Sequence, residues 1–299
     1  MANAFDEVAK NKFKSYLLMF LFAAILIGLA YVIGLVYGNG SPVIIISFMF
    51  IAFIISIVMA LVSFYWGDKA ALDISKAKPA NRRDHAHYIN TVEGLAIAAQ
   101  LPVPKIYVIP DQSINAFATG RDPEHASIAV TEGAIKKLDR VELEGVVAHE
   151  MSHVKNYDMR LMTVTVILVG LIALLSDLFI RSMWFGGGRD NEGRNGNAVI
   201  LIIGILLAIL APIIAELIKL AISRKREYAA DAQGAILSRN PQSLADALKK
   251  IQKDSAENKV ATKATAHLYF SSPFKKGSFS NFFSTHPPIE ERIKRLEAM

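Results

Sequence analysis

The chain contains no cysteine among its 299 residues. Disulfide bonds and thiolate ligands are therefore excluded, and any protein-bound metal must be held by His, Asp or Glu side chains. Charged residues are also scarce, at 20% against 53% hydrophobic residues, and this composition, with a mean hydropathy of +0.33, is too apolar for an ordinary soluble enzyme. The formal net charge is +6 without any nucleic-acid-binding motif, so we do not expect nucleic acid as a partner.

Two long uncharged runs account for much of the apolar composition, Tyr16–Tyr37 and Pro42–Trp66. Each is long enough for a helix to cross about 30 Å of hydrocarbon, which takes roughly 20 residues. The first run is too long for the apolar region of a signal peptide. Residues 38–40, Gly-Asn-Gly, predict a tight turn between the runs. The alternative, a hairpin buried in a soluble core, is disfavoured because neither run contains a charge.

Two further apolar runs lie later in the chain, Leu161–Ile180 and Ala198–Ile222. The third run contains Asp177 near its end, and the fourth is apolar until Glu216 and Lys219. Because an off-centre carboxylate still leaves a marginally favourable segment, both runs are predicted to span the membrane, four spans in all. The alternative for this second pair is an apolar hairpin that lies against the soluble domain.

Basic residues mark the predicted cytoplasmic side of the membrane. They flank the first hairpin and follow the last run: Lys10, Lys12, Lys14, Lys69, Lys76, Lys78, Arg82, Arg83, Arg224, Lys225 and Arg226. Because lysine and arginine are retained on the cytoplasmic face, we expect both termini and the soluble part of the chain to be cytoplasmic.

The remaining segments have the patterns of an α+β domain, mainly α, with a small β-sheet. The expected elements are helices at Ala86–Gln100, from Asp139 onward, at Asn240–Ile251 and at Ile289–Glu297, strands at Lys105–Ile109 and Ala126–Thr131, and a short extended piece at Asn115–Gly120 that ends in a turn. The helix from Asp139 has a capping box with Glu142, so its start is well defined.

The helix from Asp139 contains the pattern H-E-x-x-H at residues 149–153. His149 and His153 lie one helical turn apart on one face, so both imidazoles can reach the same ion. Glu150 follows directly and can reach a water on that ion without being a ligand. This arrangement favours zinc, with one coordination position left open for water.

A third protein ligand is needed, and the order of the chain indicates Glu227. The helix with residues 149–153 ends where the third apolar run begins, and Glu227 follows shortly after the end of the fourth run. If the two runs form a hairpin, the two histidines and Glu227 meet at the same end of that hairpin. Asp231 lies one turn later and can accept the free ring N–H of a ligand histidine, which fixes its tautomer. The alternative for Glu227 is a surface acid paired with Arg224 or Arg226.

These motifs together resemble the HtpX family of bacterial membrane zinc endopeptidases, which are related to the CAAX prenyl endopeptidases. The matching residues are His149–His153, Glu227 with Asp231, Asn115–Gly120, Thr285–Pro288 and Arg292 with Ile293. The resemblance covers essentially the full length in the same order. It implies a gluzincin-like metalloprotease domain with one zinc ion per chain in the bacterial cell membrane, and a stress-related role in protein quality control, the proteolysis of damaged or misassembled membrane proteins.

The resemblance also implies roles for residues that spacing alone does not identify. Asn115, Ala116, Phe117 and Ala118 are expected to form an edge strand along which a substrate backbone lies, since an extended peptide gains main-chain hydrogen bonds at a sheet edge. His286 is expected to donate to the oxyanion, and Arg292 to hold a substrate carbonyl or carboxylate. The other histidines are predicted to lie at the surface: His85, His87, His125 and His267.

The expected organisation is a transmembrane hairpin (1–66), the first part of a cytoplasmic catalytic domain (67–158), a second apolar hairpin (159–222) and the second part of that domain (223–299). The expected mechanism uses zinc to lower the pKa of a water toward about 7. Glu150 then takes its proton as general base and passes it to the leaving amine. The partners are polypeptides and the lipid bilayer; the oligomeric state is not predicted.

Two other functions compete with this interpretation. An intramembrane metalloprotease places the motif inside a membrane helix, but charged residues surround residues 149–153 here. A zinc-binding transporter or scaffold needs polar groups deep in its spans, and the first two runs have almost none.

Overall fold

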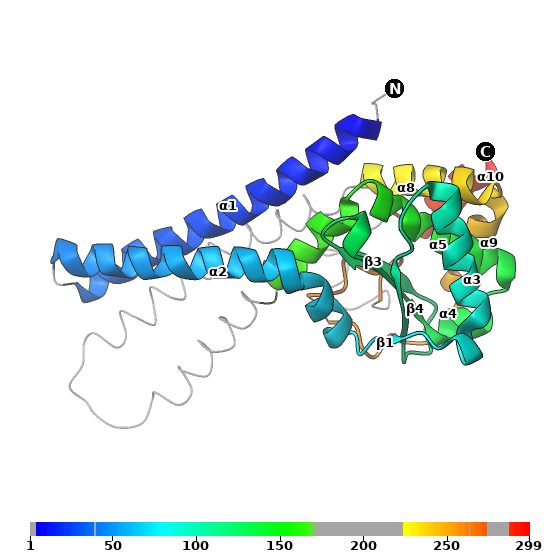
Figure 1. Cartoon of the computed structure of the whole chain (residues 1–299), viewed down its shortest axis with the longest axis horizontal. Helices are drawn as coiled ribbons and strands as arrows, with labels where there is room; N and C mark the ends of the chain where they lie inside the picture. Colours follow the sequence, from blue (N-terminus) through cyan, green and yellow to red (C-terminus); the bar gives the residue numbers. More distant parts are fainter. Residues whose placement is uncertain (1–3, 39, 169, 171–223, 263, 274–286) are drawn as a thin grey trace.

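The computed structural model describes residues 4–38, 40–168, 170, 224–262, 264–273 and 287–299. Two long helices, α1 (Ala4–Tyr37) and α2 (Pro42–Ile74), pack along each other and extend away from a compact α+β part that holds the sheet (Figure 1). This confirms the predicted helical hairpin, although α2 continues past Trp66 as one helix to Ile74.

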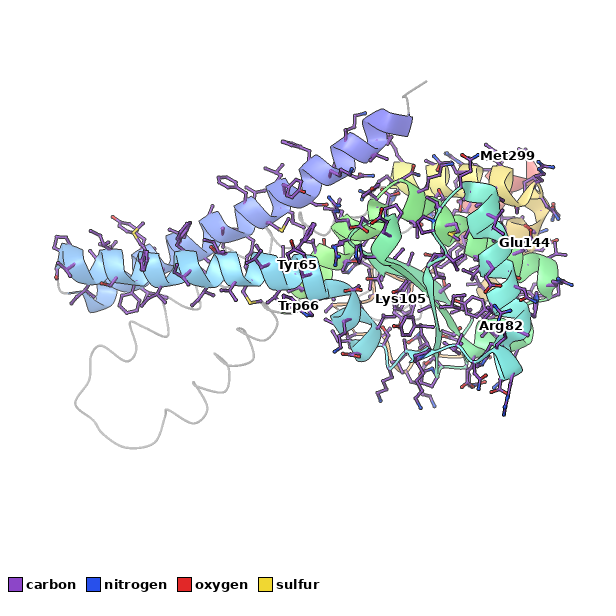
Figure 2. The ribbon with its side chains drawn as sticks, viewed as in Figure 1. Tyr65, Trp66, Arg82, Lys105, Glu144 and Met299 are labelled. Atoms are coloured by element: carbon purple, nitrogen blue, oxygen red, sulfur yellow. The ribbon has the colours of Figure 1, made fainter. Side chains whose placement is uncertain are left out.

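Both helices of the hairpin are long and apolar enough to cross a membrane by length and composition, with mean hydropathies of 2.6 and 3.0 over their spans. Their large side chains project outward along the hairpin (Figure 2), and Phe20 and Val43 are 67% and 72% exposed. Exposed apolar surface on this scale is what lipid covers. Tyr65 and Trp66 lie where the hairpin approaches the compact part, the position that aromatic residues take at a membrane interface.

The sheet has four strands in the order β1-β2-β4-β3 in the part of the chain that the structure describes. The strands are β1 (Lys78–Pro79), β2 (Lys105–Ile109), β3 (Ala116–Gly120) and β4 (Ala126–Thr131). The β2–β4 pair is parallel, and the other two pairs are antiparallel. Strands β2 and β4 match the two predicted strands, and β3 lies in the predicted extended piece, whereas β1 was not predicted because two exposed residues carry no alternating pattern.

Helices surround this sheet and place the H-E-x-x-H segment at the centre of the domain. They are α3 (Arg82–Ala99), η1 (Pro123–His125), α4 (Glu132–Lys137), α5 (Arg140–Lys155), α8 (Arg224–Ser238), α9 (Pro241–Lys253) and α10 (Ile289–Glu297). The predicted capping box is present at the start of α5, where the Asp139 carboxylate accepts from Val141 and Glu142. Asn240 likewise accepts from Ser243 at the start of α9.

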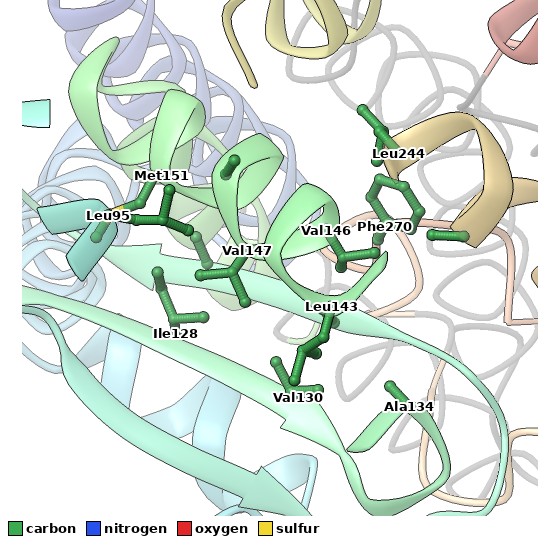
Figure 3. Close-up of a cluster of buried hydrophobic side chains, with 14 of the residues drawn as sticks. Leu95, Ile128, Val130, Ala134, Leu143, Val146, Val147, Met151, Leu244 and Phe270 are labelled. Carbon is green, nitrogen blue, oxygen red and sulfur yellow. The ribbon is translucent and has the colours of Figure 1, made fainter. Parts of the chain in front are cut away.

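The main hydrophobic core lies between α5 and the sheet. Figure 3 shows Val147 and Leu143 of α5 facing Ile128 and Val130 of β4, and all four side chains are buried. Burying an aliphatic side chain of this size contributes about 1.5–3 kcal/mol. Helix α5 also packs against α8 and α9 on its other side. It is therefore held from several directions, which makes it a rigid support for residues 149–153.

The third predicted span begins inside the described part of the chain. Residues 158–168 are helical, and Leu161, Val164 and Leu168 are buried in a cluster with Leu18 and Phe22 of α1. Apart from residue 170, the rest of the third run and the whole fourth run lie outside the described residues.

Candidate metal centre

Three side chains from two helices converge beside the sheet. His149 and His153 of α5 place their Nε2 atoms 3.1 Å apart. The Glu227 carboxylate of α8 lies 3.8 Å from Nε2 of His149 and 3.5 Å from Nε2 of His153. All three residues are at most 4% exposed. Glu227 is therefore not the surface acid of the alternative interpretation, and the structure brings the three predicted ligands together.

Two carboxylates determine which ring nitrogens face the centre. Nδ1 of His149 lies 2.9 Å from Asp231, and Nδ1 of His153 lies 3.1 Å from Asp158. Because an ionised carboxylate can only accept hydrogen bonds, each Nδ1 carries a proton and each Nε2 presents its lone pair to the other. Two lone pairs at 3.1 Å repel unless a proton or a cation lies between them. This arrangement is that of a cation site.

The spacing of the three groups fits zinc. Tetrahedral zinc with bonds of about 2.0–2.1 Å to nitrogen and oxygen separates neighbouring ligand atoms by about 3.3 Å. The separations here are 3.1, 3.5 and 3.8 Å. Two imidazoles and one carboxylate form a donor set that zinc accepts with one position left open.

Glycine at position 234 allows α8 to approach α5 this closely. A β-carbon at Gly234 would meet the backbone nitrogen of His149 at 2.9 Å and its α-carbon at 3.0 Å. Glu227 and Asp231 lie on the same helix, about two turns and one turn before it. The contact at Gly234 thus sets the distance from which both carboxylates reach the histidines.

Arg292 of α10 is fully buried and binds both oxygens of Asp231, and its Nη2 also lies 3.5 Å from Nδ1 of His149. Its Nε and Nη2 atoms donate to the two oxygens of Asp231 at 2.9 and 2.7 Å, and Nη1 donates to the Phe270 carbonyl at 3.1 Å. Burial raises the pKa of Asp231, but the charge of Arg292 and the hydrogen bond with His149 outweigh it and lower the pKa below its ordinary value. Arg292 was predicted to contact substrate; none of its side chain is exposed, its described contacts include Asp231, Phe270 and Glu227, and substrate contact stays a prediction.

Glu150 is 2% exposed and lies where the centre meets strand β3. Burial raises its pKa to about 7, with a further rise from the charge of Glu227, while the charge of His153 and a hydrogen bond from the Ala118 backbone N–H lower it. A carboxyl group with a pKa near neutrality can both accept and return a proton, as a general base must.

The pKa values of the two histidines are shifted in opposite directions. Burial lowers the pKa of His149 to about 4, although its hydrogen bond with Asp231 opposes this change. Burial also lowers the pKa of His153, but the hydrogen bond with Asp158 and the charge of Glu227 outweigh it and raise the pKa to about 9. In the absence of metal, His153 is therefore protonated on both ring nitrogens near neutral pH, and its Nε2 faces Nε2 of His149.

Four of the five residues predicted to bind substrate, Asn115 to Ala118, lie at or next to β3, at the edge of the described sheet. The Ala116 carbonyl accepts from the Phe270 N–H at 2.8 Å, and the Asn115 side chain donates to the Ser271 carbonyl at 3.0 Å. Phe117 is fully buried against Tyr269 and points away from solvent. Ala118 remains as the residue whose outward N–H meets Glu150. The main chain of β3 is thus beside the general-base candidate, while substrate contact along it stays a prediction.

His286, the predicted oxyanion donor, lies outside the described residues. His267 was predicted to lie at the surface and is instead 2% exposed, because its segment packs against the helix at residues 158–168 and its Nε2 lies 3.0 Å from the Met162 carbonyl. His85, His87 and His125 are half-buried.

Asp158 is a residue beside this centre that the sequence analysis did not assign. It lies five residues after His153, beyond the turn that ends α5, so helical spacing does not connect the two. Its position as a lone acid at the entry to an apolar run was the available signal.

Comparison with known proteins agrees with this centre. Residues 82–299 match the family model of peptidase family M48. The chain is 45% identical over 298 residues to a protease HtpX homolog of Caldanaerobacter subterraneus subsp. tengcongensis, covering 99% of this chain and 97% of that protein. It is 43% identical to the homolog of Thermoanaerobacter pseudethanolicus over the same shares of the two chains.

The crystal structure of S. mikatae Ste24p is a more distant likeness, with a TM-score of 0.46 and 19% identity over 97% of this chain and 66% of that one. The match of the M48 model to more than two thirds of the chain, and the full-length identity to HtpX proteases, decide the family. The chain belongs to peptidase family M48 and is a metallopeptidase of its HtpX group.

Proposed function

We propose that this metallopeptidase is a membrane-bound zinc endopeptidase that cleaves damaged or misassembled membrane proteins from the cytoplasmic side. The observation that carries the proposal is the pair of Nε2 atoms, 3.1 Å apart, each with its Nδ1 held by a carboxylate. The exposed apolar surface of α1 and α2 supports a lipid-embedded hairpin beside the centre.

His149, His153 and Glu227 would hold the zinc, and Asp231 and Asp158 keep the two imidazoles in the ligand tautomer. Bound zinc would supply a water of lowered pKa and a positive charge for the oxyanion. Glu150 accepts the proton of the attacking water and donates it to the amine nitrogen of the cleaved peptide bond. Its burial next to Ala118 keeps its carboxylate at the edge of the sheet, where a peptide bond must lie.

A substrate backbone in extended form would lie along β3 with its scissile bond near Ala118. The Asn115 side-chain amide donates a hydrogen bond to the Ser271 carbonyl and accepts one from the Ser271 N–H. These two bonds fix residue 271 beside the first residues of β3. His286 is proposed as the oxyanion donor, in keeping with the family resemblance. We assign Arg292 to the positioning of Asp231.

The test uses the full-length chain purified in detergent, with casein as substrate. Cleavage should stop with a chelator and return with zinc, and elemental analysis should find about one zinc per chain. Glu150→Gln should keep the zinc and lower the cleavage rate by about 10²–10⁴-fold. Cleavage by the Glu150→Gln variant at the wild-type rate would remove the general-base assignment.

The membrane part of the proposal needs a separate measurement. In proteoliposomes, a misassembled membrane protein should be cleaved faster than the same protein in its folded state, and Glu150→Gln should cleave neither. Equal cleavage of both substrates would contradict a role in quality control while leaving the peptidase activity intact.

A further inference from the structure

Asn11 is a buried polar residue at the start of the membrane hairpin. It lies on α1 within a lysine-rich stretch, yet its side chain is 1% exposed. Its Nδ2 donates to Oδ1 of Asp158 at 2.7 Å and to the Asn156 carbonyl at 3.0 Å, and its Oδ1 accepts from Nη1 of Arg226 at 3.3 Å. Both ends of the amide are therefore used in contacts with residues far along the chain.

The identity of each end of the amide follows from its neighbours. A carboxylate accepts and a guanidinium donates, so Nδ2 must face Asp158 and Oδ1 must face Arg226. The asparagine amide presents its donor and its acceptor on two separate atoms, whereas the hydroxyl of a serine or threonine carries both on one oxygen. An aspartate at position 11 would place a second carboxylate against Asp158, and a leucine would leave Asp158 without this donor.

Asp158 connects Asn11 to the metal centre. Oδ1 of Asp158 accepts a hydrogen bond from the Asn11 side chain, and Oδ2 of Asp158 lies 3.1 Å from Nδ1 of His153. The terminal torsion of an aspartate is broad when nothing holds it. With Oδ1 held by Asn11, Oδ2 stays directed at the imidazole, and the proton of His153 stays on Nδ1. The Nε2 lone pair that a metal needs is thereby preserved.

We infer that Asn11 is a positioning residue of the metal centre, which links the first membrane-proximal helix to His153 through Asp158. The inference rests on the proposed zinc site. It gives α1 a second role besides anchoring, because the same helix that enters the apolar hairpin orients a metal ligand. Its basis is a continuous chain of hydrogen bonds between buried groups, Asn11 to Asp158 to His153.

The test compares Asn11→Leu with Ser15→Ala in the full-length chain in detergent. Ser15 is a matched control: it lies one turn further along α1, is fully buried, and donates to the Asn11 carbonyl in its own helix. Zinc affinity is measured by competition with a chelator, and the visible spectrum of the cobalt-substituted protein reports the ligand geometry. Asn11→Leu should weaken zinc binding about 10–100-fold and change the cobalt spectrum, whereas Ser15→Ala should do neither.

Cleavage activity at high zinc concentration distinguishes a loss of zinc affinity from a general folding defect. Excess zinc should restore most of the cleavage by Asn11→Leu, because the variant lacks affinity and not the general base. In a double-mutant cycle with Asp158→Asn, the effect of Asn11→Leu on affinity should largely disappear. If Asn11→Leu does not fold, Asn11→Ser, which keeps a small polar group, takes its place in the same cycle.

The outcomes separate the inference from the proposed function. Wild-type affinity in the Asn11 variants, or equal losses in the Ser15 control, would overturn the inference while zinc-dependent cleavage stands. Additive effects of Asn11 and Asp158 on affinity would overturn it as well. A wild-type chain that binds no zinc would instead overturn the proposed function, and the positioning role with it.

Discussion

Gly234 of α8 lies against the backbone of His149 on α5, so closely that a β-carbon there would come within 2.9 Å of the His149 nitrogen. The two helices cross at this point, and α8 carries both Glu227 and Asp231 toward the histidines. The absence of one side chain therefore sets the width of the metal centre, although Gly234 touches no ligand atom in the contacts described here.

Gly234→Ala should separate α8 from α5 by a few tenths of an ångström. We expect a loss of about 1–3 kcal/mol in the free energy of unfolding, as for other overpacked positions, and weaker zinc binding. Gly94→Ala on α3 is the control, because no atom lies within 4 Å of a β-carbon there and alanine favours helix. Thermal unfolding with and without zinc measures both effects. If Gly234→Ala changed neither the stability nor the zinc affinity, α8 would be able to shift away from α5 without affecting the site.

Glu227→Ala should remove a ligand and lower zinc affinity by at least about 100-fold. The control is Glu124→Ala, which removes an acid from a second group of possible ligands, Asp122, Glu124 and His125. That group is more exposed, and we expect the control to keep its zinc. Elemental analysis after dialysis measures the occupancy, and full occupancy in Glu227→Ala would exclude it as a ligand.

Zinc binding should release about one proton near pH 7. The pKa of His153 is raised to about 9 in the metal-free centre, so a proton occupies its Nε2 below that pH and must leave before metal binds. The apparent affinity should therefore rise about tenfold per pH unit from pH 7 toward pH 9 and fall as the pH decreases. Titration calorimetry in buffers of different ionisation enthalpy counts the protons. An affinity independent of pH between 7 and 9 would contradict the raised pKa of His153.

Arg292→Met should leave the buried Asp231 carboxylate without its cation. Removing one partner of a buried ion pair costs about 3–5 kcal/mol. Arg295→Met on the same helix is the control, since that side chain is half exposed in its bridge to Glu291, and its loss should cost about 1 kcal/mol or less. Denaturant unfolding in detergent compares the two. Equal losses in both variants would argue against a special role for the pair with Asp231.

The orientation in the membrane can be tested directly because the chain has no cysteine to give a background. A cysteine introduced at Ser41, at the end of the hairpin, should react with a membrane-impermeant maleimide applied from outside. One introduced at Ala298, near the C-terminus, should react only after the membrane is opened. Labelling of Ala298→Cys in intact cells would place the catalytic domain on the other side.

Helix α5 could be predicted from interactions between residues that are close in the chain. Its start follows from Asp139 and Glu142, which cap one another within three residues, and its ligand face follows from the spacing of His149 and His153. Such interactions involve neighbours in the chain, so the sequence pattern encodes them directly. Glu227 was also predictable, because the order of the apolar runs restricts where the chain can return to the centre.

The contacts that complete the centre are of another kind. Asn11 and Asp158 are 147 residues apart, and Arg292 reaches Asp231 across 61. No periodicity links such pairs, and an arginine near the C-terminus has the same sequence pattern whether it faces a substrate or a buried carboxylate. The buried position of His267 could not be predicted for the same reason.

By itself the sequence determined the apolar hairpin, the capped helix and the chemistry of the candidate metal ligands, since each depends on residue type and local spacing. Only the tertiary structure decided which carboxylate holds which imidazole, how near Gly234 lets the helices come, and that Asn11 of α1 contacts Asp158 beside the centre. These are distances between segments that are remote in the chain, and packing sets them.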